Sequence, residues 1–308
     1  MSTEVSARLA VHLAERVGVA RRRYGKRLER CQKKYSAVSV HRLRVETRRL
    51  LALLDLLEAA RFGCRLKKVR KTFKKRLDAF DELRDTQVQM RLLRPLWRNF
   101  PEAQPFRKWL AKREKDLVER LRREIKRMKY GRLDRRLKTA ATELARRKDP
   151  SLRDAMAAAA TLHDAFERVL ELRSLVGTAD TAAIHRMRIA FKRFRYMSES
   201  LVPVFPDFTR ARLRRMQAFQ AAAGDIQDFE MLLATLARAV TEEHLSAATV
   251  RKLQRYLARV RSQKITAFLA KVDDVIAFRP GAGALPVRYQ PAPRANPTLS
   301  VVPEALIA

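Results

Sequence analysis

The residues best suited to chemistry are basic side chains that recur at fixed spacing along two predicted helices. One histidine and three cations stand at positions i, i+3, i+7 and i+10 of the second of these helices: His185, Arg188, Lys192 and Arg195. At about 100° per residue the four positions fall within about 80° of one another and rise along roughly 15 Å of helix. They predict a ladder of cations on one helix face.

A shorter ladder stands earlier in the chain. It carries a histidine and two cations at the same spacing: His41, Arg44 and Arg48. Leu51 occupies the position that corresponds to Arg195, so this ladder is one rung short. Arg49 and Arg193 stand at i+8, on the flank of each ladder.

The ladders indicate a ligand because like charges at these spacings destabilise a helix by about 0.2–0.5 kcal/mol per pair. Rows of three or four basic residues with no carboxylate among them conflict with the stability of the helix, and such conflicts tend to mark functional sites. A linear polyanion would resolve the repulsion. The predicted ligand is a string of phosphates, because arginine makes bidentate contacts with phosphate oxygens and lysine acts as a mobile point charge.

The next predicted helix in each half adds further cations. In the first half three lysines fall within about 60° on one face: Lys67, Lys71 and Lys74. The corresponding positions of the second half hold Arg210 and Arg214, followed by Gln217. We expect these cations to extend the phosphate site.

Two matched histidines and two matched aspartates leave alternatives open. His41 and His185 begin the ladders, and each is either a proton site linked to the ligand or a helix-start residue that hydrogen-bonds to a neighbouring helix. Asp85 and Asp228 either bind a cation or form ion pairs that orient the ladders. The ion pairs are favoured, because no second carboxylate stands beside Asp85 at metal-ligand spacing.

The elements that must position these residues are helices. Glycine and proline are rare before residue 279, apolar residues recur every three or four positions, and no stretch alternates with period two. This pattern predicts an all-α fold of about eight helices. The stretches at 41–50 and 83–85 match later stretches at offsets of 144 and 143 residues. We therefore expect two four-helix bundles, lobes 1–149 and 150–278, related by a pseudo-twofold around a basic groove.

The positive charge belongs to the folded part of the chain. The 308 residues include 68 Lys and Arg against 33 Asp and Glu, a net charge of +35, and residues 1–150 contribute +27 of it. A folded body with this excess repels itself unless a polyanion is near. Residues 279–308 hold six of the 12 prolines and no helical pattern, so we expect this tail to be disordered.

Composition and motifs exclude several classes of protein. Two cysteines are too few for a disulfide scaffold, and 47% hydrophobic residues are too many for a disordered chain. With no apolar stretch of about 20 residues and no signal peptide, we expect a cytoplasmic protein without a membrane partner. Glycine-rich phosphate loops, HExxH, GxSxG and CxxC motifs are absent, so the sequence predicts no enzyme, no cofactor and no metal site.

With these motifs in view, residues 5–278 resemble the CHAD family, the conserved histidine α-helical domain. Four stretches carry the resemblance: HRLRVETRRL at 41–50, LRD at 83–85, IHRMRIAFKRFRY at 184–196 and AGDIQD at 223–228. It implies two four-helix bundles around a basic channel that binds inorganic polyphosphate, and association with polyphosphate granules as in bacterial members. The role falls on the ladder residues: His41, Arg44, Arg48, His185, Arg188, Lys192 and Arg195. Some family members are fused to a triphosphate-processing tunnel domain marked by an ExExK strand, and this sequence has no such motif.

The leading hypothesis is therefore a non-enzymatic protein that binds inorganic polyphosphate. The alternative is a protein that binds the RNA or DNA backbone, because net charge alone does not separate the two ligands. A polyphosphatase or polyphosphate kinase is a third hypothesis. It would need carboxylate clusters for Mg²⁺, and the sequence shows none.

Overall fold

The fold is helical throughout the part of the chain that the computed structural model describes, residues 2–59, 66–126, 130–146, 152–177, 181–202, 205, 207–242 and 245–281. These ranges contain ten α-helices and no strand, which confirms the predicted all-α class. The helices in chain order are α1 (Ser2–Lys33), α2 (Ala37–Ala59), α3 (Lys67–Ala79), α4 (Asp81–Leu93), α5 (Gln104–Lys126), α6 (Gly131–Ala145), α7 (Leu152–Ser174), α8 (Thr181–Leu201), α9 (Arg210–Thr241) and α10 (Ala247–Leu269).

The described residues form ten α-helices, two more than the eight that the sequence predicts. Phe80 separates α3 from α4 without a glycine or proline, because its backbone (φ −93°, ψ 0°) leaves the α-helical region while its ring is buried. α6 lies between Gly131 and Pro150, two residue types that often interrupt helices. There Leu133, Leu137 and Leu144 are buried at helical spacing, so the stretch has an apolar face that packs against α1.

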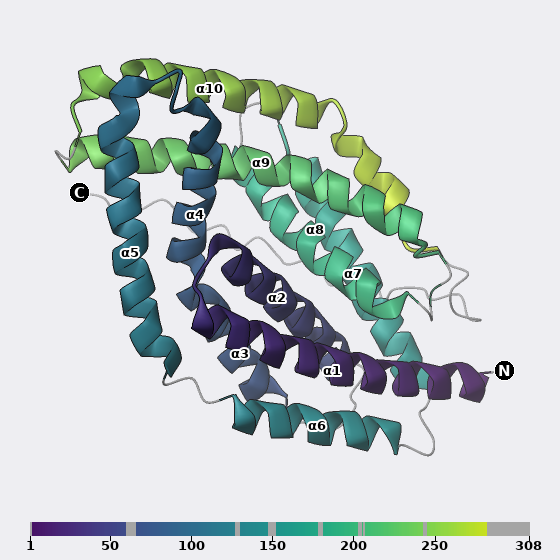
Figure 1. The fold of residues 1–308 in the computed structure, drawn as a ribbon. Coiled ribbons are helices and arrows are strands. Elements are labelled where there is room, and N and C mark those ends of the chain that lie inside the picture. The colour runs from purple at the N-terminus through teal and green to yellow at the C-terminus, as the bar shows by residue number, and fades with distance from the viewer. Residues whose placement is uncertain are drawn as a thin grey trace, which may run out of the picture.

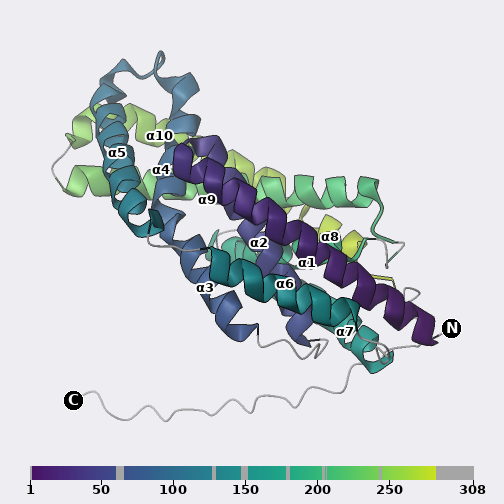
Figure 2. The same cartoon turned by 60° about the horizontal axis from the view of Figure 1, so that its bottom comes forward.

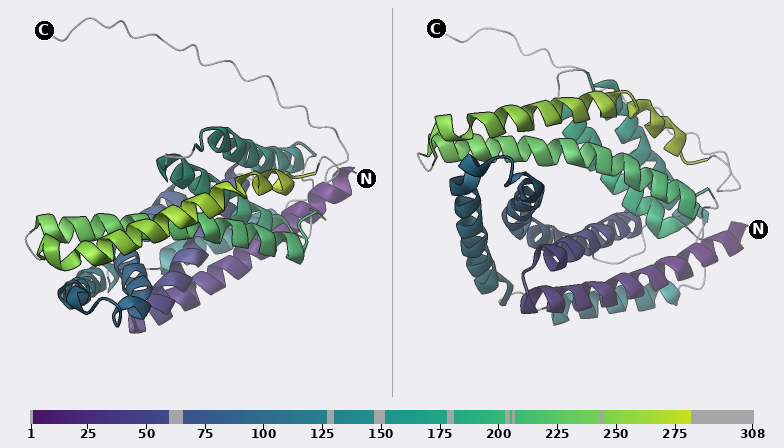
Figure 3. Two further views of the ribbon diagram at one scale, coloured as in Figure 1. Left: turned by 90° about the horizontal axis from the view of Figure 1, so that it is seen from above. Right: turned by 45° about the horizontal axis from the view of Figure 1, so that its top comes forward.

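Six of the helices pack in pairs. α1 packs with α6, α7 with α8, and α9 with α10, as Figure 1 shows. Figure 2 shows α6 beside α1, and Figure 3 shows α9 and α10 side by side from two further directions. α2 contacts α1, α3, α4, α7 and α8, so it lies where the packed helices meet.

Two hydrophobic clusters hold the helices together. The larger one joins α1, α2, α6, α7 and α8, and its aromatic centre is Phe191, whose ring lies 4.9 Å from that of Phe219 and 5.6 Å from that of Phe278. The smaller one joins the end of α4 and the start of α5 to α10 and the second half of α9. Each cluster draws residues from both sides of position 150.

The division into lobes 1–149 and 150–278 and their pseudo-twofold remain predictions. Of the tail 279–308, expected to be disordered, residues 282–308 lie outside the described residues. The backbone N–H of Gly281 donates to Asp207 at 3.0 Å, and the carbonyl of Arg279 accepts from Arg212 at 2.5 Å. None of the helices in the described ranges has the length and apolar character needed to span a membrane.

Candidate functional site

Helices α2 and α8 bring cations of the two predicted ladders together. They pack directly on one another, and α4 packs on α2. Lys192 of α8 interacts electrostatically with Arg48 and Arg44 of α2 and with Arg188 of its own helix. His41 of α2 interacts with cations of α4. We call the following residues the central cluster: His41, Arg44, Arg48, Arg84, Arg91, Arg188 and Lys192.

The cations of the central cluster differ in whether they form an ion pair with a carboxylate. Arg48, Arg84, Arg188 and Lys192 form no ion pair within the described part of the chain. The Nε of Arg188 is buried and has no hydrogen-bond partner among the described residues. Its guanidinium lies close to Gly224 of α9, with Nε 3.5 Å from where a Cβ would stand. These four cations therefore have hydrogen-bonding capacity for an anion.

Arg44 fixes the position of α2. Its side chain is only 5% exposed; Nη1 donates to the carbonyl of Leu77 at 2.7 Å, and Nη2 lies 2.5 Å from Asp81. Both partners lie at the junction of α3 and α4. Arg44 thus ties α2 to this junction, and its third guanidinium nitrogen, Nε, is buried without a partner in the described chain.

Asp85 and Asp228 lie among these cations. Burial raises the pKa of both carboxyls, and the arginines around them oppose the shift. Asp228 lies 3.6 Å from Arg91 and interacts with Arg188 and Arg84. No group of His, Cys, Asp or Glu in the described ranges is arranged to hold a metal ion. The geometry thus supports the interpretation of Asp228 as a partner that orients arginines.

Burial and mutual repulsion change the protonation of the central cluster. The pKa of Lys192 falls to about 6 because the amine is desolvated and Arg48, Arg188 and Arg44 disfavour a further charge. The pKa of His41 falls to about 4 through burial and the nearby Arg84 and Arg48. Burial also lowers the pKa of His185, against the opposing effect of a hydrogen bond with Gln227. At neutral pH these shifts favour the uncharged forms of Lys192 and His41 in the free protein.

We predict that anion binding makes Lys192 take up a proton. Phosphate oxygens beside the amine favour its charged form, so its pKa rises from about 6 in the free protein towards its ordinary value in the complex. Affinity for long-chain polyphosphate should increase as the pH falls from about 8.5 to about 6.5, by up to roughly tenfold per pH unit, and level off below about 6. Calorimetry in buffers of different ionisation enthalpy measures the proton uptake.

The control for this prediction is Lys192→Met, which removes the titrating amine. In this variant the increase over that pH range should largely disappear, leaving the weaker contribution of His41 at lower pH. An unchanged pH dependence in Lys192→Met would show that Lys192 does not titrate on binding.

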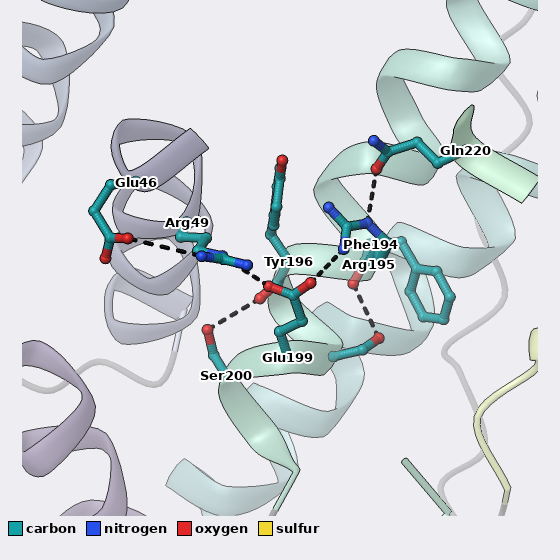
Figure 4. Close-up of polar contacts among 9 residues, drawn as sticks. Glu46, Arg49, Phe194, Arg195, Tyr196, Glu199, Ser200 and Gln220 are labelled. Carbon is teal, nitrogen blue, oxygen red and sulfur yellow. Dashed lines mark hydrogen bonds and ion pairs between the residues drawn. The ribbon is translucent and has the colours of Figure 1, made fainter. Parts of the chain in front are cut away.

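The predicted residues Arg49 and Arg195 lie in a different network, drawn in Figure 4. The Nε of Arg49 donates to Glu199 at 3.0 Å, and Glu46 lies 3.8 Å from the same guanidinium. Arg195 is buried, pairs with the other carboxylate oxygen of Glu199 and donates to Gln220 at 2.8 Å. Glu199 thus pairs with both arginines, and the ion pairs and hydrogen bonds of this network in the described chain do not include Arg188 or Lys192.

The cations predicted on α3 and at the start of α9 are exposed. Lys67 lies 3.8 Å from Glu58, and Lys74 lies 2.5 Å from Asp78. The others form no ion pair within the described ranges: Lys71, Arg210 and Arg214. None of these interactions connects them with the central cluster, so their role in ligand binding stays a prediction.

Sequence reasoning missed Arg84 and Arg91 of α4. The two arginines stand seven residues apart and thus share a helix face, and Arg84 is the middle residue of the LRD motif. Both interact with His41, and Arg84 also interacts with Arg44. The spacing rule that revealed the two ladders could also have revealed this third row.

Comparison with known proteins shows the family of the chain. A family model described as the CHAD domain matches residues 20–237. Among solved structures, the crystal structure of the CHAD domain from the plant Ricinus communis matches with a TM-score of 0.73 and 20% sequence identity, over 88% of this chain and 93% of that one. A comparison with curated proteins found no match.

Proposed function

The chain belongs to the CHAD family, and from this premise we propose that it binds inorganic polyphosphate at the central cluster, without catalysing a reaction. One observation carries the proposal: α2, α4 and α8 place six Lys and Arg side chains together, and four of these form no ion pair in the described chain. A chain of phosphates supplies many negative oxygens to such a site. Binding would combine charge-assisted hydrogen bonds from arginine with the charge of Lys192.

The proposed location of the protein in the cell follows from the same ligand. A protein that holds polyphosphate by many weak contacts along the chain is suited to coat large polyphosphate assemblies. We place its action in the cytoplasm, at polyphosphate granules.

The experiment that tests the function is a direct competition. Labelled long-chain polyphosphate bound to the protein is challenged with unlabelled polyphosphate, single-stranded RNA or duplex DNA at equal phosphate concentration and near-physiological salt. We expect polyphosphate to displace the label at least tenfold more effectively than either nucleic acid, because nucleic acid separates its phosphates with sugars and presents fewer charges to a compact cluster. RNA or DNA competing as well as polyphosphate would favour a nucleic-acid backbone binder instead.

A further inference from the structure

Like charges repel one another where α2 packs against α8, so other interactions in the fold must hold the two helices together. Arg48 of α2 and Arg188 of α8 repel one another, and neither forms an ion pair in the described chain. In the absence of ligand this repulsion favours separation of the two helices. Two carboxylates beside the central cluster link α8 to neighbouring helices.

The first carboxylate is Asp55 of α2. Its Oδ1 accepts from the Nε of Arg70 on α3 at 2.5 Å, and its Oδ2 accepts from the Nε of Arg193 on α8 at 2.9 Å. The Asp55 side chain is 9% exposed, whereas its partners Arg70 and Arg193 are 44% and 52% exposed, so solvent reaches the arginine side of each ion pair. One carboxylate thus joins three helices.

The second carboxylate is Glu199 of α8, at the centre of Figure 4. One oxygen accepts from Arg49 of α2 at 3.0 Å, and the other accepts from Arg195 of its own helix. Arg195 in turn donates to Gln220 of α9 at 2.8 Å. Glu199 thus connects α2, α8 and α9, and its side chain is 17% exposed.

Along both helices the two bridges follow the repelling charges in the chain. Asp55 lies six residues after Arg49 on α2, and Glu199 lies six residues after Arg193 on α8, a separation of roughly 9 Å along each helix. Arg48 directly precedes Arg49, and Lys192 directly precedes Arg193. Each cross-helix bridge therefore adjoins a residue of the central cluster.

We propose that Asp55 and Glu199 are positioning residues that hold α2 and α8 together against the repulsion of the central cluster, so that the anion site is assembled before its ligand arrives. This inference rests on the proposed function in naming the ligand. The positioning itself is a property of the free protein, so it is testable without polyphosphate.

The first test measures affinity. Asp55→Asn and Glu199→Gln keep the size of each side chain and remove its charge, and we expect each to weaken polyphosphate binding by roughly tenfold. The matched control is Asp134→Asn, which removes an ion pair of 2.5 Å with Arg21 between α1 and α6, away from the central cluster. The control should bind as the parent protein does. Asp55→Asn and Glu199→Gln binding as tightly as the control would overturn the proposal.

The second test separates positioning from ordinary stabilisation, and it uses the free protein. Glu199→Gln, Arg188→Gln and the double variant form a cycle in which unfolding by urea is measured. If Glu199 opposes the repulsion, Glu199→Gln should lower the folding equilibrium constant less in the Arg188→Gln background than in the parent protein. The two reductions should differ by roughly 2- to 150-fold. This coupling is expected although the two side chains share no contact in the described structure. Asp134→Asn should show no such coupling with Arg188→Gln.

Additive effects of Glu199→Gln and Arg188→Gln would overturn the positioning role. If Glu199→Gln does not fold, the same cycle is run with Asp55→Asn. If Asp55→Asn fails to fold on its own but folds when Arg188→Gln is also present, that result is the expected coupling. Coupling without polyphosphate binding would contradict the proposed function and leave the positioning intact.

Discussion

Replacing Arg48, Arg188 and Lys192 together by glutamine is expected to weaken polyphosphate binding by more than about 10³-fold. Each of these side chains can form a charge-assisted hydrogen bond worth about 1.5–3 kcal/mol, and their positions on α2 and α8 place the three contacts in one site. Titration of labelled polyphosphate at fixed salt measures the change.

The control for this triple variant removes three charges elsewhere. Arg132, Arg135 and Arg136 are exposed on α6, and replacing them by glutamine should lower affinity less than tenfold, since it reduces only long-range attraction. The loss in the cluster variant is not expected to come from misfolding, because removing the mutually repelling charges of Arg48 and Arg188 should leave its melting temperature unchanged or raise it. Equal losses in the two variants would mean that the charge acts diffusely.

The affinity for polyphosphate should also fall steeply with salt. Binding of phosphates by cations releases the counterions that the polyanion held. With six to ten phosphates neutralised, the affinity falls by roughly 10³–10⁵ between about 50 and 200 mM salt on the calibration for duplex DNA. The measurement is the slope of the logarithm of the association constant against the logarithm of the salt concentration.

The triple variant supplies the matched comparison for this slope. Three fewer cations at the site should reduce its magnitude by roughly 2 to 3, whereas a flat salt response in the parent protein would contradict binding by multiple phosphate contacts.

Helical periodicity was sufficient to predict which cations share a face, but it does not say which faces meet. The spacing of Arg44 and Arg48, and that of Arg188 and Lys192, correctly placed each pair on one side of its helix, and tertiary packing then brought the two pairs together. Spacing could not predict that Arg195 would pair with Glu199, because side-chain pairing depends on the neighbouring helices.

The difference between local spacing and tertiary packing also explains why one helix boundary and two ion pairs were not predicted from the sequence. The boundary at Phe80 has no helix-breaking residue, since burial of its ring in the core replaces the usual glycine or proline signal. The partners of Arg49 and Arg193 come from α8 and α2, about 140–150 positions away in the chain, where no local pattern connects them. Long-range ion pairs of this kind become visible only when the fold is known.

The central claim is that polyphosphate lies where α2, α4 and α8 meet. A crystal structure of the protein soaked with short-chain polyphosphate tests it most directly. Phosphate groups in contact with Arg48, Arg188 and Lys192 are the predicted result. Phosphates bound only to the outer faces of α1, α5 and α6, with the central cluster empty, would contradict the account.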